Sequence, residues 1–135
     1  MRPAVLLCIL SLALVACGAE SRDSAEEFTG AERGVAAAVE DLESAARDND
    51  GAKVCTRLFA ASLLASIKEK GNDCATALED AFRDADSLDL KVDEVTISGT
   101  KASAKVTSGT GGKKKTDTLE LEKVGAGWRI SSLSA

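Results

Sequence analysis

Apolar residues recur at helical spacing in the first half of the chain, after residue 30. Three helices are predicted there, over about 31–48, 51–70 and from about 73 to an end near 84–87. Asn72 or Asp73 is expected to cap the third helix. The first helix has the clearest pattern, because its apolar residues fall on one face while glutamates occupy the other. Its buried face is expected to carry Val35, Val39, Leu42 and Ala46.

In the second half, apolar and polar residues alternate, which is typical of strands with one buried face. The alternation slips by one residue between Val92 and Val95, and such a slip predicts a β-bulge. Glycine-containing turns separate four alternating stretches, at about 88–97, 102–107, 118–122 and 128–131. Helices followed by an antiparallel meander predict an α+β fold, with about three helices packed on a sheet of about four strands.

The first residues form a separate segment with its own pattern. A short basic start, Met1 to Pro3, precedes an uninterrupted apolar run from Ala4 to Ala16. The run is too short for a bilayer-spanning helix, which needs roughly 20 residues. Its length and flanks are typical of a signal peptide, with an N-terminal membrane anchor as the alternative.

The end of that run resembles the lipobox of bacterial lipoproteins, in the residues Leu14-Val15-Ala16-Cys17-Gly18. The resemblance implies that the Cys17 sulfur receives a diacylglyceryl group and that cleavage follows Ala16. The alternative is ordinary secretion with Cys17 as a plain thiol. The expected organisation is a signal peptide at 1–16, a lipidated N-terminus and flexible tether at 17–30, and a folded domain at 31–135. The domain would stand on the extracytoplasmic face of the cell membrane.

Cys55 and Cys74 are the remaining cysteines of the mature chain, and in an exported protein such a pair predicts a disulfide. A zinc site is a less favoured explanation of this pair, because zinc needs four ligands and the chain has no histidine to complete them. A redox-active pair is also less favoured, because such cysteines usually form a Cys-x-x-Cys motif. A straight helix from Cys55 to Lys70 would be about 22 Å long, too long to bring Cys74 back for a bridge. The helix is therefore expected to break around 59–62, with Ser62 as the N-cap of the second piece.

Composition narrows the chemistry further. The chain has 135 residues, a formal net charge of −5, no histidine, no tyrosine and a single tryptophan. An acidic chain is a poor nucleic-acid binder, so no nucleic-acid partner is expected. Histidine is the commonest general base and the commonest metal ligand. No catalytic residue, metal site or cofactor is therefore predicted.

A known family shares the alanine-rich first helix, the cysteine in the second helical region and sequential hairpins, such as Val95 to Val106, that end in Gly127-Trp128-Arg129-Ile130. They resemble small bacterial lipoproteins, of actinobacterial type, with a nuclear-transport-factor-2-like domain. The resemblance implies a strongly curved sheet that wraps around the helices as a cone with an apolar cavity. Enzymes of this fold use tyrosine and histidine groups, which this chain lacks. The residues expected to line the cavity are Val39, Leu42, Leu63, Phe82, Ala104, Leu119 and Trp128.

Two functions of different classes follow from these patterns. The favoured one is a non-catalytic interaction module of the cell envelope, held to the membrane through lipid on Cys17. It would dock an envelope protein or form a homodimer, through an exposed apolar patch on the outer face of the sheet. The alternative is a carrier that binds an apolar small molecule or lipid in the cone cavity. A histidine-free enzyme is the least favoured hypothesis.

Overall fold

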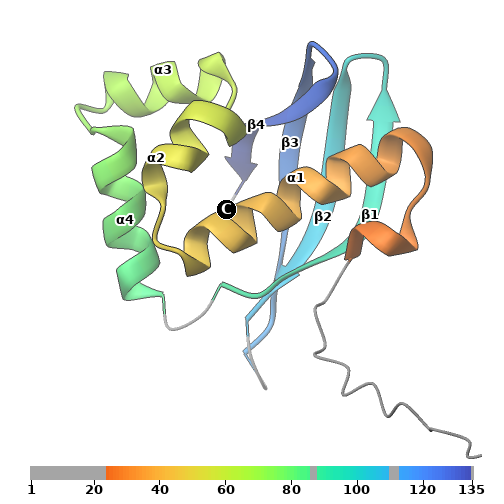
Figure 1. Ribbon diagram of the computed structural model, residues 1–135, viewed down its shortest axis with the longest axis horizontal. Helices are drawn as coiled ribbons and strands as arrows, with labels where there is room; N and C mark the ends of the chain where they lie inside the picture. Colours follow the sequence, from red (N-terminus) through yellow and green to blue (C-terminus); the bar gives the residue numbers. More distant parts are fainter. Residues whose placement is uncertain (1–23, 86–87, 110–112, 135) are drawn as a thin grey trace, which may run out of the picture.

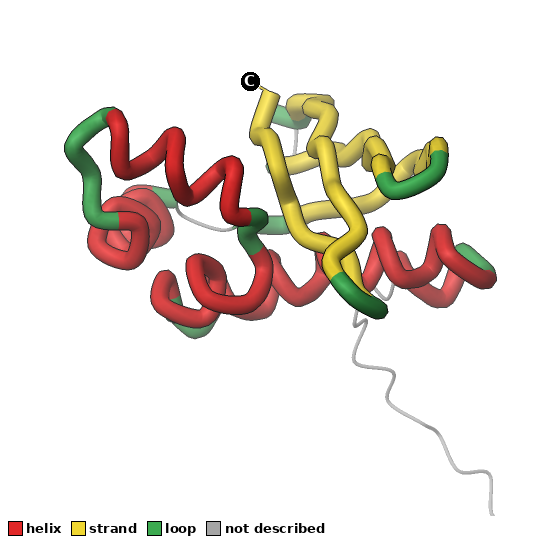
Figure 2. The backbone as a smooth tube through the Cα atoms, turned by 90° about the horizontal axis from the view of Figure 1, so that it is seen from above, coloured by secondary structure: helices red, strands yellow, loops and turns green. Residues whose placement is uncertain are grey.

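The computed structural model describes residues 24–85, 88–109 and 113–134. The architecture is α+β, as predicted: a four-stranded antiparallel sheet with helices on one of its faces (Figure 1). The long helix α1, Gly30–Arg47, crosses that face, and the shorter helices lie beside the sheet. Seen along the sheet, the helices occupy one side and the opposite face of the strands carries no helix (Figure 2). Within the described residues, no helix is long and apolar enough to cross a membrane.

Among the described helices, α1 contributes the most buried residues to the core. Its bounds agree within one residue with the predicted helix at 31–48. It is preceded by the 3-10 turn η1, Ser24–Glu27, in which the Ala25 amide donates to Glu40 Oε1 at 2.6 Å. Ser24 and Ala25 are buried, so the packed domain begins a few residues before the predicted boundary at residue 31. The apolar buried face of α1 comprises Val35, Ala36, Ala38, Val39, Leu42, Ala45 and Ala46.

The second helical region is broken, as the cysteine spacing predicted. The short helix α2, Gly51–Lys53, continues into a π-helical turn, η2, Val54–Leu58. Phe59 and Ala60 are extended, and helix α3, Ala61–Glu69, starts in a new direction.

The predicted N-cap at Ser62 is wrong, because Ser62 lies inside α3 and the capping position is Ala60. Contacts with the sheet set this boundary. Phe59 forms a parallel bridge with Ile130, and the Ala60 amide donates to the Ile130 carbonyl at 2.8 Å. The break is thus held by backbone pairing along a strand edge, and no side-chain cap is needed.

Four consecutive strands pair in the order β1-β2-β3-β4, each antiparallel to the next. Their bounds are Leu90–Ser98, Lys101–Ser108, Lys115–Val124 and Gly127–Ser134. The bulge predicted after Val92 is confirmed, since the register shifts between Val92 and Glu94 and leaves Asp93 as the extra residue. A second, unpredicted shift leaves Ser131 as the extra residue of β4. The sheet is open, with β1 and β4 as its edges.

The two faces of the sheet differ sharply in chemistry. The inner face packs against α1 through Val92, Val95, Ala102, Ala104, Val106, Leu119, Leu121 and Ile130. Among the strand side chains that the structure describes, those of the opposite parity point outward, and apart from Val124 and Gly127 they belong to polar or charged residues. Lys101 Nζ on β2, for example, lies 2.9 Å from Glu122 Oε2 on the neighbouring strand β3. The expected apolar patch on the outer sheet face is therefore wrong, because on either side of the two bulges the apolar side chains alternate toward the core.

Candidate functional site

A pocket of about 450 Å³ opens where α1, the α2–η2 segment and the start of β4 meet. It is half-enclosed by these elements. Its apolar wall is formed by the indole of Trp128, the side chain of Leu58 and the small residues of one stretch of α1. The residues that line it are Gly34, Ala37, Ala38, Asp41, Lys53, Arg57, Leu58, Gly127 and Trp128.

The indole of Trp128 lies unusually close to the backbone of α1. A Cβ added at Gly34 would be 3.2 Å from Trp128 Cδ1 and 3.5 Å from Nε1. Glycine within a helix costs about 1 kcal/mol relative to alanine, so its presence here needs a local reason. The close approach of the indole is that reason, and it leaves one edge of the ring uncovered. The indole N–H finds no acceptor among the described residues.

Three charged side chains surround this indole-lined hollow. Asp41 comes from α1, one turn beyond Ala37, while Lys53 and Arg57 are four residues apart at the end of α2 and in η2. Residues four apart on a helical turn face the same side, so the two cations lie together. In the described part of the chain, none of the three has an ion-pair partner. Among the residues that the structure describes, the pocket thus has two cations and one carboxylate without an ion-pair partner.

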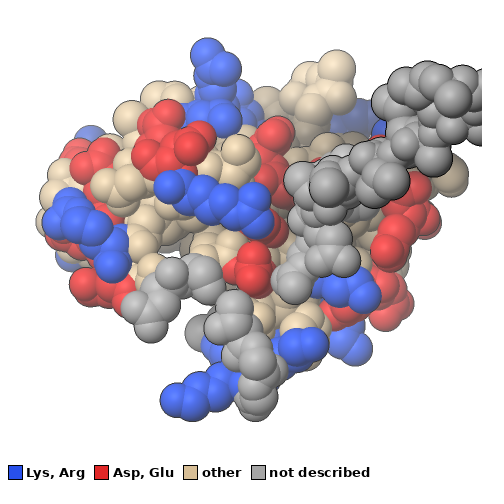
Figure 3. All heavy atoms as spheres, turned by 60° about the horizontal axis from the view of Figure 1, so that its bottom comes forward, with Lys and Arg blue, Asp and Glu red and all other residues tan. Residues whose placement is uncertain are grey.

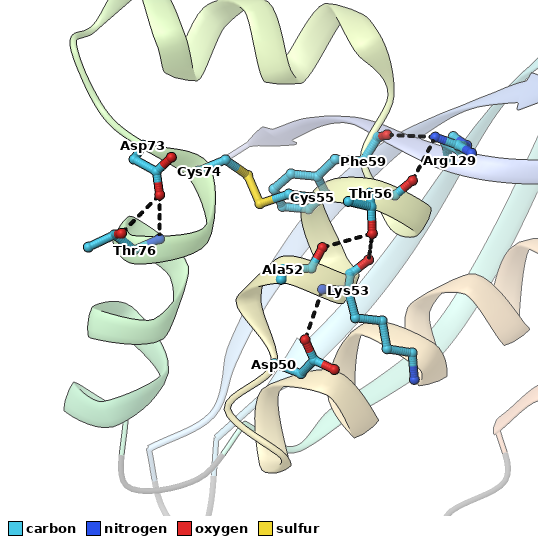
Figure 4. The surroundings of a disulfide bond; sticks show 10 residues. All are labelled: Asp50, Ala52, Lys53, Cys55, Thr56, Phe59, Asp73, Cys74, Thr76 and Arg129. Atoms are coloured by element: carbon cyan, nitrogen blue, oxygen red, sulfur yellow. Dashed lines mark hydrogen bonds between the residues drawn. A yellow bond between two sulfur atoms is a disulfide. The ribbon is translucent and has the colours of Figure 1, made fainter.

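Hydrogen bonds hold the cationic side of the pocket against the sheet (Figure 4). The guanidinium of Arg129, on β4, donates to the carbonyls of Thr56 at 3.4 Å and Phe59 at 3.5 Å. These carbonyls belong to the last turn of η2, where a cation also interacts favourably with the helix dipole. The Asp50 side chain caps the other end by accepting from the Lys53 amide at 2.9 Å. The segment that carries Lys53 is therefore anchored at both ends.

The predicted disulfide is confirmed: Cys55 in η2 is bonded to Cys74, with their Cα atoms 6.1 Å apart. Cys74 is the first residue of α4, Cys74–Asp84, and Asp73 is its N-cap (Figure 4). The Asp73 carboxylate accepts from the Thr76 amide at 3.0 Å and from the Thr76 hydroxyl at 2.9 Å. These two bonds favour the charged form and lower the pKa of Asp73 below its ordinary value of 3.8.

The residues expected to line an apolar cavity separate into two groups. Four of them are buried in the core between α1 and the sheet: Val39, Leu42, Ala104 and Leu119. Leu63, Phe82 and Trp128 are half-buried and pack against the margin of that core. The pocket described above shares only Trp128 with the expected lining. The apolar cone cavity stays a prediction, and the lipidation residue, Cys17, lies outside the described residues.

Sequence reasoning missed the charged side of this pocket. Two signals were present: a glycine, Gly34, inside a strong helical pattern, and cations at Lys53 and Arg57 with helical spacing. Neither signal says what lies opposite, because Trp128 reaches the pocket only through the packing of β4 beside α1. The pocket could therefore not be assembled from the sequence.

Other chemistry is not favoured by the arrangement of side chains. Across residues 24–85, 88–109 and 113–134, no group of three or more metal-ligating side chains lies together. On the face drawn in Figure 3, basic and acidic side chains are interspersed, with uncharged surface between them. The described residues drawn on that face thus form no broad patch of one charge sign.

No family model, no curated protein and no solved structure matches this chain. The resemblance to nuclear-transport-factor-2-like lipoproteins therefore stays a prediction from the sequence.

Proposed function

We propose that the chain is a membrane-tethered, extracytoplasmic and non-catalytic binding module. The sequence supports the tether, through the apolar run to Ala16 and the lipobox-like residues that end at Cys17 and Gly18. The Cys55–Cys74 disulfide supports an oxidising compartment, because such bonds form and persist outside the cytosol. The lack of histidine and tyrosine in the whole chain supports a role in binding without catalysis.

The observation that carries the binding role is the half-enclosed pocket beside Trp128. Ligand sites are commonly concave, about 300–1,000 Å³ in volume, and lined by apolar surface with a few convergent polar groups. The pocket has the volume, an indole wall and three charged side chains without partners in the described part of the chain. This favours a small ligand over the docking of a protein on the outer sheet face, which is polar.

A second candidate function, docking of another envelope protein, is supported by the surface of α3 and α4. Neither helix contains a fully buried residue, although both carry large apolar side chains. These side chains are only half-buried: Leu63, Leu64, Ile67, Leu78 and Phe82. A partner or a second copy of this chain would gain apolar burial by covering them.

Replacing Cys17 by serine tests the tether. We expect Cys17→Ser to move the protein from the membrane fraction to the soluble extracytoplasmic fraction, because the acyl chains would no longer be attached. A matched Cys8→Ser variant, altered within the apolar run, should stay with the membrane. A Cys17→Ser protein that remains membrane-bound would show that the lipobox interpretation is wrong.

Native mass spectrometry of the released Cys17→Ser chain, purified from the extracytoplasmic fraction, tests the binding role. An additional small mass that is lost on denaturation supports ligand binding. A bare monomer that crosslinks to a protein in intact cells, or a dimer, supports the docking alternative. Neither result depends on the tether, because the released chain carries no lipid.

A further inference from the structure

We infer that the pocket beside Trp128 takes a small organic carboxylate with an apolar body. The inference rests on the binding role proposed above and names the chemical class of the ligand. It follows from three features of the pocket: an apolar wall, two adjacent cations and a single opposing carboxylate.

The apolar wall accounts for the body of the ligand. Trp128, Leu58 and the alanines of α1 present carbon surface to the hollow, and Gly34 leaves the edge of the indole uncovered. Burial of apolar ligand surface here is favourable by about 25 cal/mol for each Å² removed from water. A purely polar ligand would leave this wall in contact with water and gain nothing from it.

The two cations account for the carboxylate. A guanidinium presents a planar fork of donors that matches the two oxygens of a carboxylate, and a neighbouring ammonium adds a point charge. Arg57 and Lys53 provide this combination, and neither is engaged by an acidic side chain in the described part of the molecule. Arg129 and Asp50 hold the backbone of the segment that carries them, so this backbone needs little ordering on binding.

Asp41 limits the charge of the ligand. With two cations and one carboxylate at the rim, the charged side chains of the pocket sum to +1. A monoanion neutralises that charge, whereas a phosphate dianion would bring excess negative charge close to Asp41. The pocket therefore favours an amphipathic monoanion over inorganic phosphate or a polyanion.

The protein contains its own reporter for the test. Trp128 is the only tryptophan and there is no tyrosine, so intrinsic fluorescence reports on this pocket alone. The full Cys17→Ser chain is titrated with octanoate, with octan-1-ol as the uncharged analogue and with inorganic phosphate as the anion without an apolar body. We expect a saturable fluorescence change with octanoate. The affinities for octan-1-ol and for phosphate should each be at least about tenfold lower than the affinity for octanoate.

Four variants test how each charged side chain of the pocket contributes to the affinity. Arg57→Gln and Lys53→Gln should each lower the octanoate affinity by about tenfold. Asp41→Asn should raise it several-fold and should improve phosphate binding, because the opposing charge is removed. Lys105→Gln, on the exposed outer face of the sheet, serves as the matched control and should leave the affinity unchanged.

Three results would overturn the inference. They are equal affinities for octanoate and octan-1-ol, an unchanged octanoate affinity in Arg57→Gln, or no saturable octanoate signal. Binding of octan-1-ol without preference for octanoate would leave the binding role standing and refute only the ligand class. If none of the probes binds and native mass spectrometry finds no ligand mass, both the ligand class and the small-molecule role are wrong.

Discussion

The disulfide offers the sharpest test of how this domain is held together. Cys55 and Cys74 are 19 residues apart in the sequence, and their bond joins η2 to the first residue of α4. In the chain-entropy treatment, closing a loop of this size stabilises a fold by about 3 kcal/mol. Because α3 and α4 contain no fully buried residue, little other burial secures them to the rest of the domain.

The perturbation is the double replacement of Cys55 and Cys74 by serine, made in the released Cys17→Ser chain. We expect the free energy of unfolding in urea to fall by about 3 kcal/mol. For a domain of this size each kcal/mol corresponds to roughly 4–8 °C, so the thermal midpoint should fall by about 12 °C or more. The parent chain treated with a reductant serves as the control and should unfold like the double variant.

Hydrogen exchange then shows where the stability is lost. Amides of α4, Cys74–Asp84, should exchange much faster in the double variant, while those of β2 and β3 should change only with the global stability. A loss below about 1 kcal/mol, or equal loss of protection in α4 and the central strands, would refute the view that the bond secures this part of the domain.

Three further predictions concern single residues. Glu43 is buried, and its Oε2 accepts from the Leu90 amide at 2.9 Å, so Glu43→Ala should lower the free energy of unfolding in urea by about 1–3 kcal/mol. Ser44→Ala, at the exposed neighbouring position, should change it by less than about 0.5 kcal/mol. Equal effects of the two substitutions would contradict a stabilising role of the Glu43–Leu90 hydrogen bond. Gly34→Ala should shift the Trp128 fluorescence, because the indole must move away from a Cβ that would be 3.2 Å from its Cδ1, and an unshifted spectrum would be inconsistent with this close approach. Since the folded pKa of Asp73 is lowered, its cap contributes fully above the unfolded pKa and is lost as pH falls through the folded pKa, below 3.8. The Thr76 amide shift in NMR should titrate below that value and lose this step in Asp73→Asn, so a midpoint above 3.8 would disprove the capping argument.

The amino-acid sequence by itself determined the elements whose signals are local. Helix α1 was predicted at 31–48 and lies at Gly30–Arg47, because the burial of one helical face imposes a periodic pattern on neighbouring residues. The bulge after Val92 was also predictable from a local pattern, because one extra residue in a strand shifts the alternation of apolar and polar residues by one position. The break between Cys55 and Cys74 followed from chain geometry, because a straight helix cannot bring its ends within reach of one bond.

The tertiary structure alone decided the features that depend on distant partners. The start of α3 is set by pairing of Phe59 and Ala60 with Ile130, and no pattern near Ser62 reports that contact. The pocket likewise joins Gly34, Arg57 and Trp128 from three separate segments. A periodic pattern records which side of an element is buried, but it carries no information on which element lies opposite. The helices and strands were therefore predictable from the sequence, whereas the pocket exists only once α1, η2 and β4 are packed together.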